Sequence, residues 1–201
     1  MTAYDLFPSV AEQAERNIAG VRVFARLHGI MFEGDAHAWA VFSPCRTYRY
    51  LLGRQWDASK PCARFTMLNP SVAGGLRSDP TAAKVRGFSE RLGCGSYIAG
   101  NLAALVSTDP RGMLAHGAPI GPLNGLALDM LLSDNSQGPL IAAWGRFPSK
   151  RIATLLAEHA SGVRDRQPWC YGTTQDGQPR HPLMLAYSTP LVSLANGRAF
   201  P

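Results

Sequence analysis

The sequence predicts an α/β fold of three layers, α/β/α, in which helices cover both faces of a central, mostly parallel sheet. Beyond about residue 61, apolar stretches of strand length alternate with stretches of helical spacing, and this alternation is typical of parallel sheets covered by helices. Hydrophobic residues make up 46% of the 201 residues, enough to bury a core in one domain. No apolar run reaches the roughly 18 residues of a membrane span, so we expect no membrane partner.

The first 60 residues predict an extension of this same domain, made of a helix and a β-hairpin. Ser9 and Glu12 form a capping-box pattern, so a helix should run from there to about Ala19. Residues 21–27 alternate apolar and basic side chains, which predicts a strand. Residues 36–56 are rich in aromatic and β-branched side chains and are interrupted by a Ser-Pro pair, which predicts a hairpin or strand pair. The segment 1–20 carries acidic residues and lacks the basic-then-apolar order of a secretory signal.

Residues 61–201 predict the alternating core. The predicted strands are short and apolar, and they cover residues 64–68, 97–100, 139–144 and 169–172. The predicted helices cover residues 80–92, 122–132 and 149–159. The first of these helices has a clear start, because Asp79-Pro80 supplies a capping carboxylate and a proline in the first turn.

Polar residues follow four of the predicted strands. They are Asn69 with Ser71, Asn101, Gly145 with Arg146, and the segment 173–181. Ligands of open α/β sheets bind beyond the carboxyl ends of the strands. We therefore expect these four segments to meet at one rim and to form the functional site.

The four cysteines predict no metal site. Cys45, Cys62, Cys94 and Cys170 are far apart and include no C-x-x-C pair, whereas zinc and iron–sulfur sites usually show close pairs of ligands. We expect reduced, buried thiols, a cytoplasmic protein and no cofactor.

Five short motifs occur in order and resemble an uncharacterised bacterial and phage family, the domain of unknown function 1643. The resemblance covers about residues 45–190 and implies no activity. The motifs are Met67-Leu68-Asn69-Pro70-Ser71, Ser78-Asp79-Pro80-Thr81, Gly100-Asn101-Leu102, Ala143-Trp144-Gly145 and His181-Pro182-Leu183.

The same order also resembles, more distantly, the uracil-DNA glycosylase superfamily. The resemblance implies that Asn69-Pro70-Ser71 positions an attacking water and that Asn101 reads a base edge. It implies that Trp144-Gly145 ends a third strand and that His181-Pro182-Leu183 inserts beside the base. The chain departs from that superfamily in three ways: no glycine precedes the first loop, leucine replaces serine in the last motif, and the iron–sulfur cysteine pattern is absent.

The chemistry of N-glycosidic cleavage fits these residue types. His181 could donate a hydrogen bond to the departing base, and Asn101 offers a donor and an acceptor to a base edge. Asn69 could hold the water, with Asp79 as the nearby alternative because a carboxylate is a stronger base. An amide at the water position requires a good leaving group, which favours a modified base over uracil, for example a hypermodified pyrimidine of phage DNA in antiviral defence or DNA processing.

DNA is the expected macromolecular partner of a monomeric protein, consistent with a net charge of +6. A flipped base needs aromatic platforms, and the candidates are Phe88, Trp144 and Tyr97. Phosphates need amides and cations, and the candidates are Gly74, Gly75, Arg77, Arg146, Lys150 and Arg180.

Each functional interpretation has a structural alternative. Asn69-Pro70-Ser71 could be a simple turn, Asp79 a helix cap and Trp144 a core residue. The chain as a whole could be a non-catalytic nucleic-acid-binding module, or an enzyme that uses the same pocket for free nucleosides or nucleotides.

Overall fold

A computed structural model describes residues 9–71, 79–107, 109–133 and 137–201 of the chain. The elements run in the order α1 (Val10–Leu27), β1 (Met31–Gly34), β2 (Ala38–Phe42), β3 (Arg49–Gln55), β4 (Cys62–Met67), α2 (Pro80–Arg91), β5 (Ser96–Asn101), η2 (Pro110–His116), α3 (Asn124–Ser133), β6 (Leu140–Ala142), α4 (Lys150–Leu155), α5 (Ala157–Asp165), β7 (Trp169–Cys170), η3 (Pro182–Met184) and β8 (Val192–Ser193). The fold is mixed α/β, and η2 and η3 are 3₁₀ helices.

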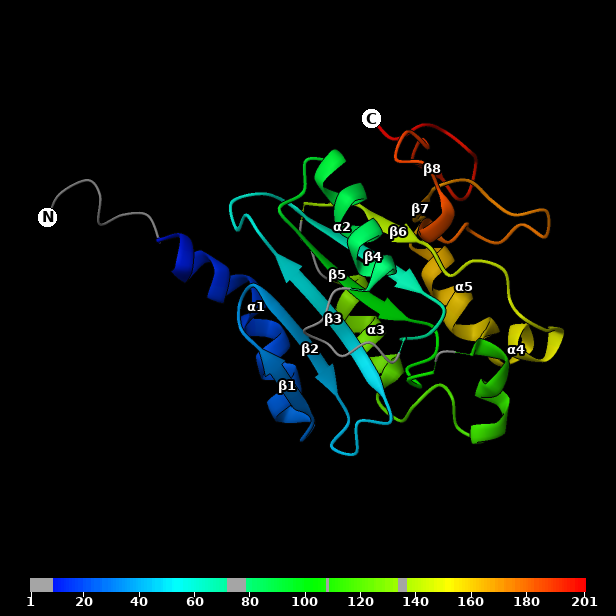
Figure 1. The fold of residues 1–201 in the computed structure, drawn as a ribbon, viewed down its shortest axis with the longest axis horizontal. Coiled ribbons are helices and arrows are strands. Elements are labelled where there is room, and N and C mark those ends of the chain that lie inside the picture. The colour runs from blue at the N-terminus through cyan, green and yellow to red at the C-terminus, as the bar shows by residue number, and fades with distance from the viewer. Residues whose placement is uncertain (1–8, 72–78, 108, 134–136) are drawn as a thin grey trace, which may run out of the picture.

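All eight strands belong to one sheet, with the order β1-β2-β3-β5-β4-β6-β7-β8 (Figure 1). Only β5, β4, β6 and β7 pair in parallel, whereas β1-β2, β2-β3, β3-β5 and β7-β8 are antiparallel. The prediction of a mostly parallel sheet is therefore wrong. Its physical reason lies in the connections: the short links between β1, β2 and β3 allow only antiparallel pairing, and parallel pairs need a crossover connection.

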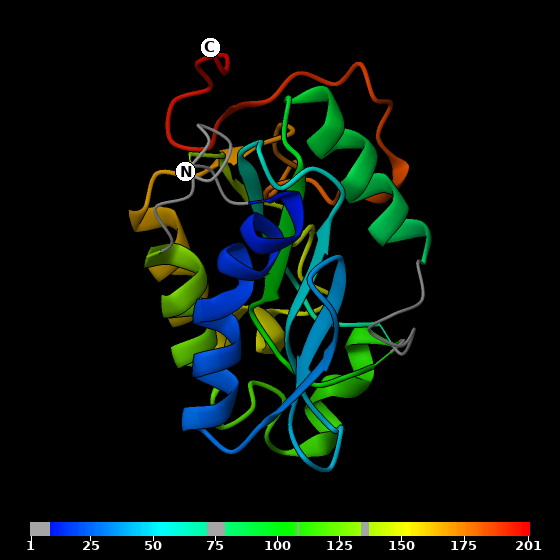
Figure 2. The same ribbon diagram turned by 90° about the vertical axis from the view of Figure 1, so that its left-hand side faces the viewer.

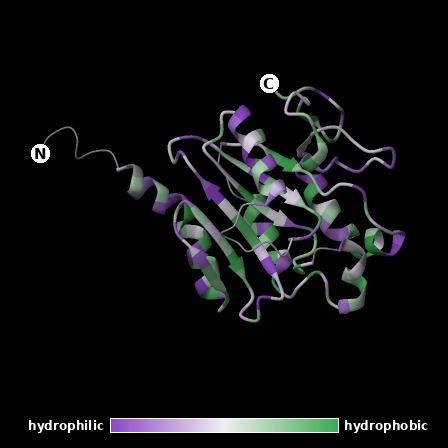
Figure 3. Ribbon diagram, viewed as in Figure 1, coloured by the Kyte–Doolittle hydropathy of each residue, from purple (hydrophilic) through white to green (hydrophobic). Residues whose placement is uncertain are grey.

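Helices lie on both faces of this sheet. Leu52 packs in a core cluster with Val85 and Phe88 of α2, whereas its neighbour Leu51 packs in another cluster with residues of α1 and α3. Because successive side chains of a strand point to opposite faces, α2 and the pair α1–α3 cover opposite faces (Figure 2). Hydrophobic residues are concentrated in the strands and on the inner sides of the helices (Figure 3).

The first helix is longer than the sequence predicts. The capping box of Ser9 and Glu12 is present, but α1 continues through residues 21–27, where we expected a strand. Val21, Phe24 and Ala25 are buried at helical spacing, whereas Val23 and Leu27 are exposed. The same residues also have the spacing of an apolar stripe along one side of a helix, and burial of that stripe on the sheet favours the helix over the strand.

The other predicted elements correspond to observed ones. The expected strand pair at 36–56 is β2 and β3, and α2 begins after Asp79 with proline in its first turn. The helix expected over residues 149–159 is divided into α4 and α5. The short strands β1 and β8 were not predicted. None of the helices in the described ranges is long and apolar enough to span a membrane.

Candidate functional site

The carboxyl ends of β4, β5 and β6 lie at one edge of the sheet, which we call the carboxyl rim. The backbone links its parts: Leu102 N–H donates to the carbonyl of Met67 at 2.8 Å, and Ser107 N–H donates to that of Pro70 at 3.0 Å. Gly145 N–H donates to the carbonyl of Pro179 at 2.9 Å, which joins the end of β6 to the loop before His181. The segments carrying Asn69, Asn101, Gly145 and His181 are thus connected around this edge.

The side chain of Asn69 is held in one orientation. Its Nδ2 donates to the carbonyl of Ser107 at 2.9 Å and to that of Pro70 at 3.2 Å. Both partners are acceptors, so they fix which end of the amide is nitrogen. No described residue donates to the oxygen Oδ1, so it can accept a hydrogen bond from a water or a substrate hydroxyl.

Asp79 joins the loop after β4 to the start of α2. Its carboxylate accepts from the Ser71 hydroxyl at 2.6 Å and from the Ala82 N–H at 2.6 Å. The second bond caps α2, as the helix-cap interpretation predicted. Asp79 therefore fixes Ser71, and both carboxylate oxygens have protein donors.

His181 is a neutral hydrogen-bond donor. The N–H of Leu183 donates to its Nδ1 at 3.3 Å, so the neutral ring carries its proton on Nε2. Burial lowers the pKa of His181, and the negative charge of Asp79 opposes this only in part. The ring is therefore neutral near pH 7, with its Nε2–H as the donor.

Two neighbours determine where His181 sits. Gly145 has a φ of +74°, and a Cβ at this position would lie 3.1 Å from the Cβ of His181. On the other side, Leu185 packs in the same core cluster as Val85 and Phe88 of α2. His181 therefore lies between the end of β6, which its Cβ approaches, and η3, which packs against α2, the helix that Asp79 caps.

Asn101 is buried at the end of β5, 4% exposed. Residues 97, 99 and 101 of β5 point to the same face of the sheet, and Tyr97 and Ala99 pack with residues of α2. The side chain of Asn101 therefore lies on the face that α2 covers, and Asp79 caps this helix. Asn124, which the sequence interpretation missed, holds this strand end: its Nδ2 donates to the carbonyls of Asn101 at 2.9 Å and Leu102 at 3.1 Å.

The three predicted stacking platforms are core residues. Phe88 and Tyr97 are 2% and 1% exposed, and the ring of Phe88 lies 4.2 Å from that of Tyr171. Trp144 is 1% exposed and donates from Nε1 to Gln178 at 2.9 Å. Their burial corrects the prediction that these rings stack on a base, because each is already covered by protein.

Among the predicted phosphate contacts, Arg146, Lys150 and Arg180 are exposed. Arg146 pairs with Asp176 at 3.4 Å, and Arg180 N–H donates to the carbonyl of Gly172 at 3.0 Å. Gly74, Gly75 and Arg77 lie outside the described residues.

Arg49 is a buried cation that the sequence interpretation missed. It begins β3, is 7% exposed and pairs in register with Phe42. Burial lowers its pKa to about 10, and Asp79 opposes that shift. Arg49 therefore belongs to the same charge cluster as Asp79 and His181. The position of Arg49 directly before the apolar residues 50–52 was the signal in the sequence from which its burial could have been predicted.

The cysteines are free thiols. Cys94 and Cys170 are buried, as predicted, but Cys45 is exposed, and hydrogen bonds with Ser43 and Thr47 lower its pKa to about 7. In the described parts of the chain, no three His, Cys, Asp or Glu residues cluster as metal ligands would.

One family matches the chain. The family is described as a protein of unknown function, DUF1643, and its match covers residues 49–183. No curated protein and no solved structure matches. The matched range contains the whole carboxyl rim.

Proposed function

This chain belongs to the DUF1643 family of proteins of unknown function, and we propose that it is an N-glycosyl hydrolase that removes a modified or otherwise non-standard base from DNA. The observation that carries the proposal is the neutral Nε2–H of His181, held between Gly145 and η3 at the rim that also bears Asn69 and Asn101. We also propose that the motifs of this rim correspond to those of the uracil-DNA glycosylase superfamily, which they distantly resemble.

The reaction needs a donor where negative charge develops. Water adds to the anomeric carbon of the sugar, and the electron pair of the breaking carbon–nitrogen bond leaves with the base. The proton released by the water is finally taken up by the base. A fixed donor in a desolvated site stabilises the departing anion more than bulk water does, and His181 supplies such a donor without carrying a charge.

Asn69 acts in this proposal as the water holder. Its Nδ2 donates to two carbonyls, and Oδ1, to which none of the residues described in the structure donates, accepts from the attacking water. An amide oxygen does not take up a proton at neutral pH, so it orients the water and activates it little. The base must therefore leave readily, which favours an electron-poor or modified base.

Access to a base in a duplex requires that it be flipped out of the stack. Leu183 and Met184 follow His181-Pro182 and are 37% and 89% exposed. Exposed apolar side chains of this kind can enter the gap that a flipped base leaves. The exposed cations Arg146 and Lys150 follow β6 and are the proposed contacts to phosphates.

The test is an excision assay on DNAs that carry different modified or deaminated bases, with abasic sites revealed by alkali or an abasic endonuclease. His181→Ala should reduce the rate of the chemical step by about 100- to 1,000-fold, the effect of losing one such donor. Asn69→Ala should abolish excision and leave DNA binding nearly intact. His28→Ala removes an exposed histidine at the end of α1 and serves as the matched control.

Two results would reject this function. DNA binding without abasic sites on any substrate would indicate a non-catalytic nucleic-acid-binding module, which the amide at position 69 also favours because it is no general base. An affinity that does not change with salt would indicate a free nucleoside or nucleotide substrate, since contacts to DNA phosphates depend steeply on salt.

A further inference from the structure

One side of α2 holds two cations against a single tyrosine ring. The Nζ of Lys84 lies 4.0 Å from the centroid of the Tyr187 ring, and the Cζ of Arg91 lies 4.2 Å from it. Residues three and four apart are neighbours on a helix, so positions 84, 87 and 91 share one side of α2. Gly87 lets the ring approach the helix, because a Cβ there would lie 2.6 Å from the Tyr187 hydroxyl oxygen. We call Lys84, Gly87, Arg91 and Tyr187 the α2 strip.

The positive charge of this strip is not neutralised by the protein. Within the described parts of the chain, no carboxylate forms an ion pair with Lys84 or Arg91. Glu90, the one acidic residue of α2, pairs instead with Arg86 at 2.9 Å. Residues 177–201, which include the tyrosine, contain no acidic residue. The ring attracts each cation but does not remove the repulsion between them, so the strip is suited to an anionic partner.

The strip is continuous with the carboxyl rim. α2 begins directly after its cap, Asp79, and η3, which packs against α2, begins directly after His181. At about 1.5 Å per residue of helix, Lys84 and Arg91 lie roughly 7 and 18 Å from Asp79 along the axis. Phosphates of one DNA strand follow one another at about 3.4 Å along the duplex. A strand that runs along α2 from the rim would therefore place phosphates roughly two to five nucleotides from the flipped base over the strip.

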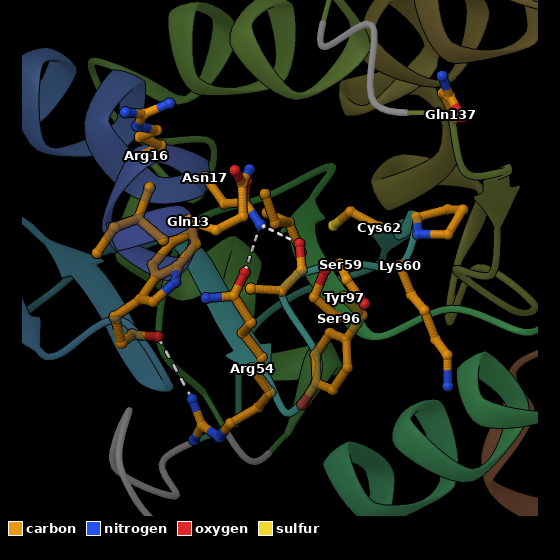
Figure 4. Close-up of a pocket in the computed structure, with 16 residues that line it drawn as sticks. Gln13, Arg16, Asn17, Arg54, Ser59, Lys60, Cys62, Ser96, Tyr97 and Gln137 are labelled. Carbon is orange, nitrogen blue, oxygen red and sulfur yellow. Dashed lines mark hydrogen bonds between the residues drawn. The ribbon is translucent and has the colours of Figure 1, made fainter. Parts of the chain in front are cut away.

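The cations of a cavity elsewhere in the protein do not converge in this way. This cavity of about 510 Å³ lies at the edge of the sheet opposite the carboxyl rim (Figure 4). Arg54 pairs in register with Tyr97 and lies on the face that α2 covers, whereas Arg16 belongs to α1, which covers the other face. The sheet separates these two arginines, so they cannot surround one anion. The two cations of the α2 strip share one ring and can act on one partner.

We propose that the α2 strip binds the sugar–phosphate backbone of DNA beside the base that enters the rim, with Lys84 and Arg91 each contacting a phosphate. The inference rests on the proposed function for the choice of DNA as the polyanion. Each cation is already held on the ring, so a contact to a phosphate costs less side-chain entropy than one made by a mobile cation. Contacts to phosphates position the duplex and carry no sequence information, so the strip should bind DNA of any sequence.

Fluorescence anisotropy with a labelled duplex of ordinary bases tests this contact without requiring base excision. Each phosphate contact contributes about 0.9 to the slope of log affinity against log salt concentration. Lys84→Gln/Arg91→Gln should therefore reduce that slope by about 2 and weaken the duplex by about tenfold or more at low salt. Arg91→Gln alone should reduce the slope by about 1. The matched control, Arg26→Gln/Arg166→Gln, removes two exposed cations outside the strip and should leave the slope unchanged.

A variant that keeps both charges separates electrostatic binding from a structural effect. Lys84→Arg/Arg91→Lys should bind the duplex nearly as the wild type does. The proposal is overturned if the double glutamine variant keeps the wild-type slope, or if the charge-conserving variant loses it as well. Tighter binding of poly-L-glutamate than of the duplex would also overturn it, since the surface would then fit an acidic protein.

The two proposals can fail separately. Excision at saturating DNA should stay at the wild-type rate in Lys84→Gln/Arg91→Gln, because the strip contacts the flank and not the reacting base. A wild-type protein that excises no base, with the slope reduced in the double variant, would reject the glycosylase activity and keep the α2 strip as a DNA contact. Excision with an unchanged slope would do the reverse.

Discussion

Replacing Gly145 by alanine tests how closely the end of β6 fits His181. Gly145 has a φ of +74°, a left-handed conformation that costs an alanine about 1 to 2 kcal/mol. The added Cβ would also lie 3.1 Å from the Cβ of His181, so the histidine must move by a few tenths of an ångström. Gly177 has a φ of +70° and nothing within 4 Å of an added Cβ. Gly177→Ala therefore carries the backbone cost without the contact.

Urea denaturation and an NMR titration of His181 measure the difference. Gly177→Ala should lower the free energy of unfolding by about 1 to 2 kcal/mol, and Gly145→Ala by about 1 kcal/mol or more beyond that. Only Gly145→Ala should change the pKa of His181 and slow base excision. If the two variants unfold with equal free energies and His181 titrates as in the wild type, then His181 does not fit closely against the end of β6.

Three further predictions concern groups already described. Burial lowers the pKa of His181, so the unfolded chain binds a proton on this ring more readily than the folded chain does. The free energy of unfolding should therefore fall as the pH drops below about 6.5. His181→Ala should flatten that part of the pH profile, and an equal slope would contradict the lowered pKa of His181. Phe88→Ala should lower the free energy of unfolding by about 3 to 5 kcal/mol, and a loss below about 1 kcal/mol would mean that the ring is not in the core. At pH 7 iodoacetamide should alkylate Cys45, which is exposed, before the buried Cys94 and Cys170, and equal rates by mass spectrometry would contradict their burial.

The convergence of polar residues at the carboxyl rim was predictable from local signals. Asp79-Pro80 marks a helix start by the chemistry of capping, and a short apolar run before Asn69 marks a strand. Once β4, β5 and β6 pair in parallel, geometry brings the residues after them to one edge. That step needs only the order of strands and helices along the chain.

The features that were missed depend on long-range packing. Whether Phe88 faces a ligand or the core depends on which side of α2 meets the sheet, which the helix sequence leaves open. The burial of Arg49 depends on β3 pairing with β5, two strands that are distant in the chain. Likewise, residues 21–27 satisfy the patterns of a strand and of a helix, and only their packing on the sheet distinguishes the two.

The order of the strands also limits how this sheet can associate with other chains. A long, flat edge strand is a template for edge-to-edge pairing with another chain, whereas a short edge strand offers few unpaired backbone groups for such pairing. The sheet ends in β1, four residues long, and in β8, two residues long. Val192 of β8 also forms a bridge to Ala199, so the chain's own end shields that side. Both edge strands therefore disfavour the pairing of this sheet with the sheet of another copy of the chain.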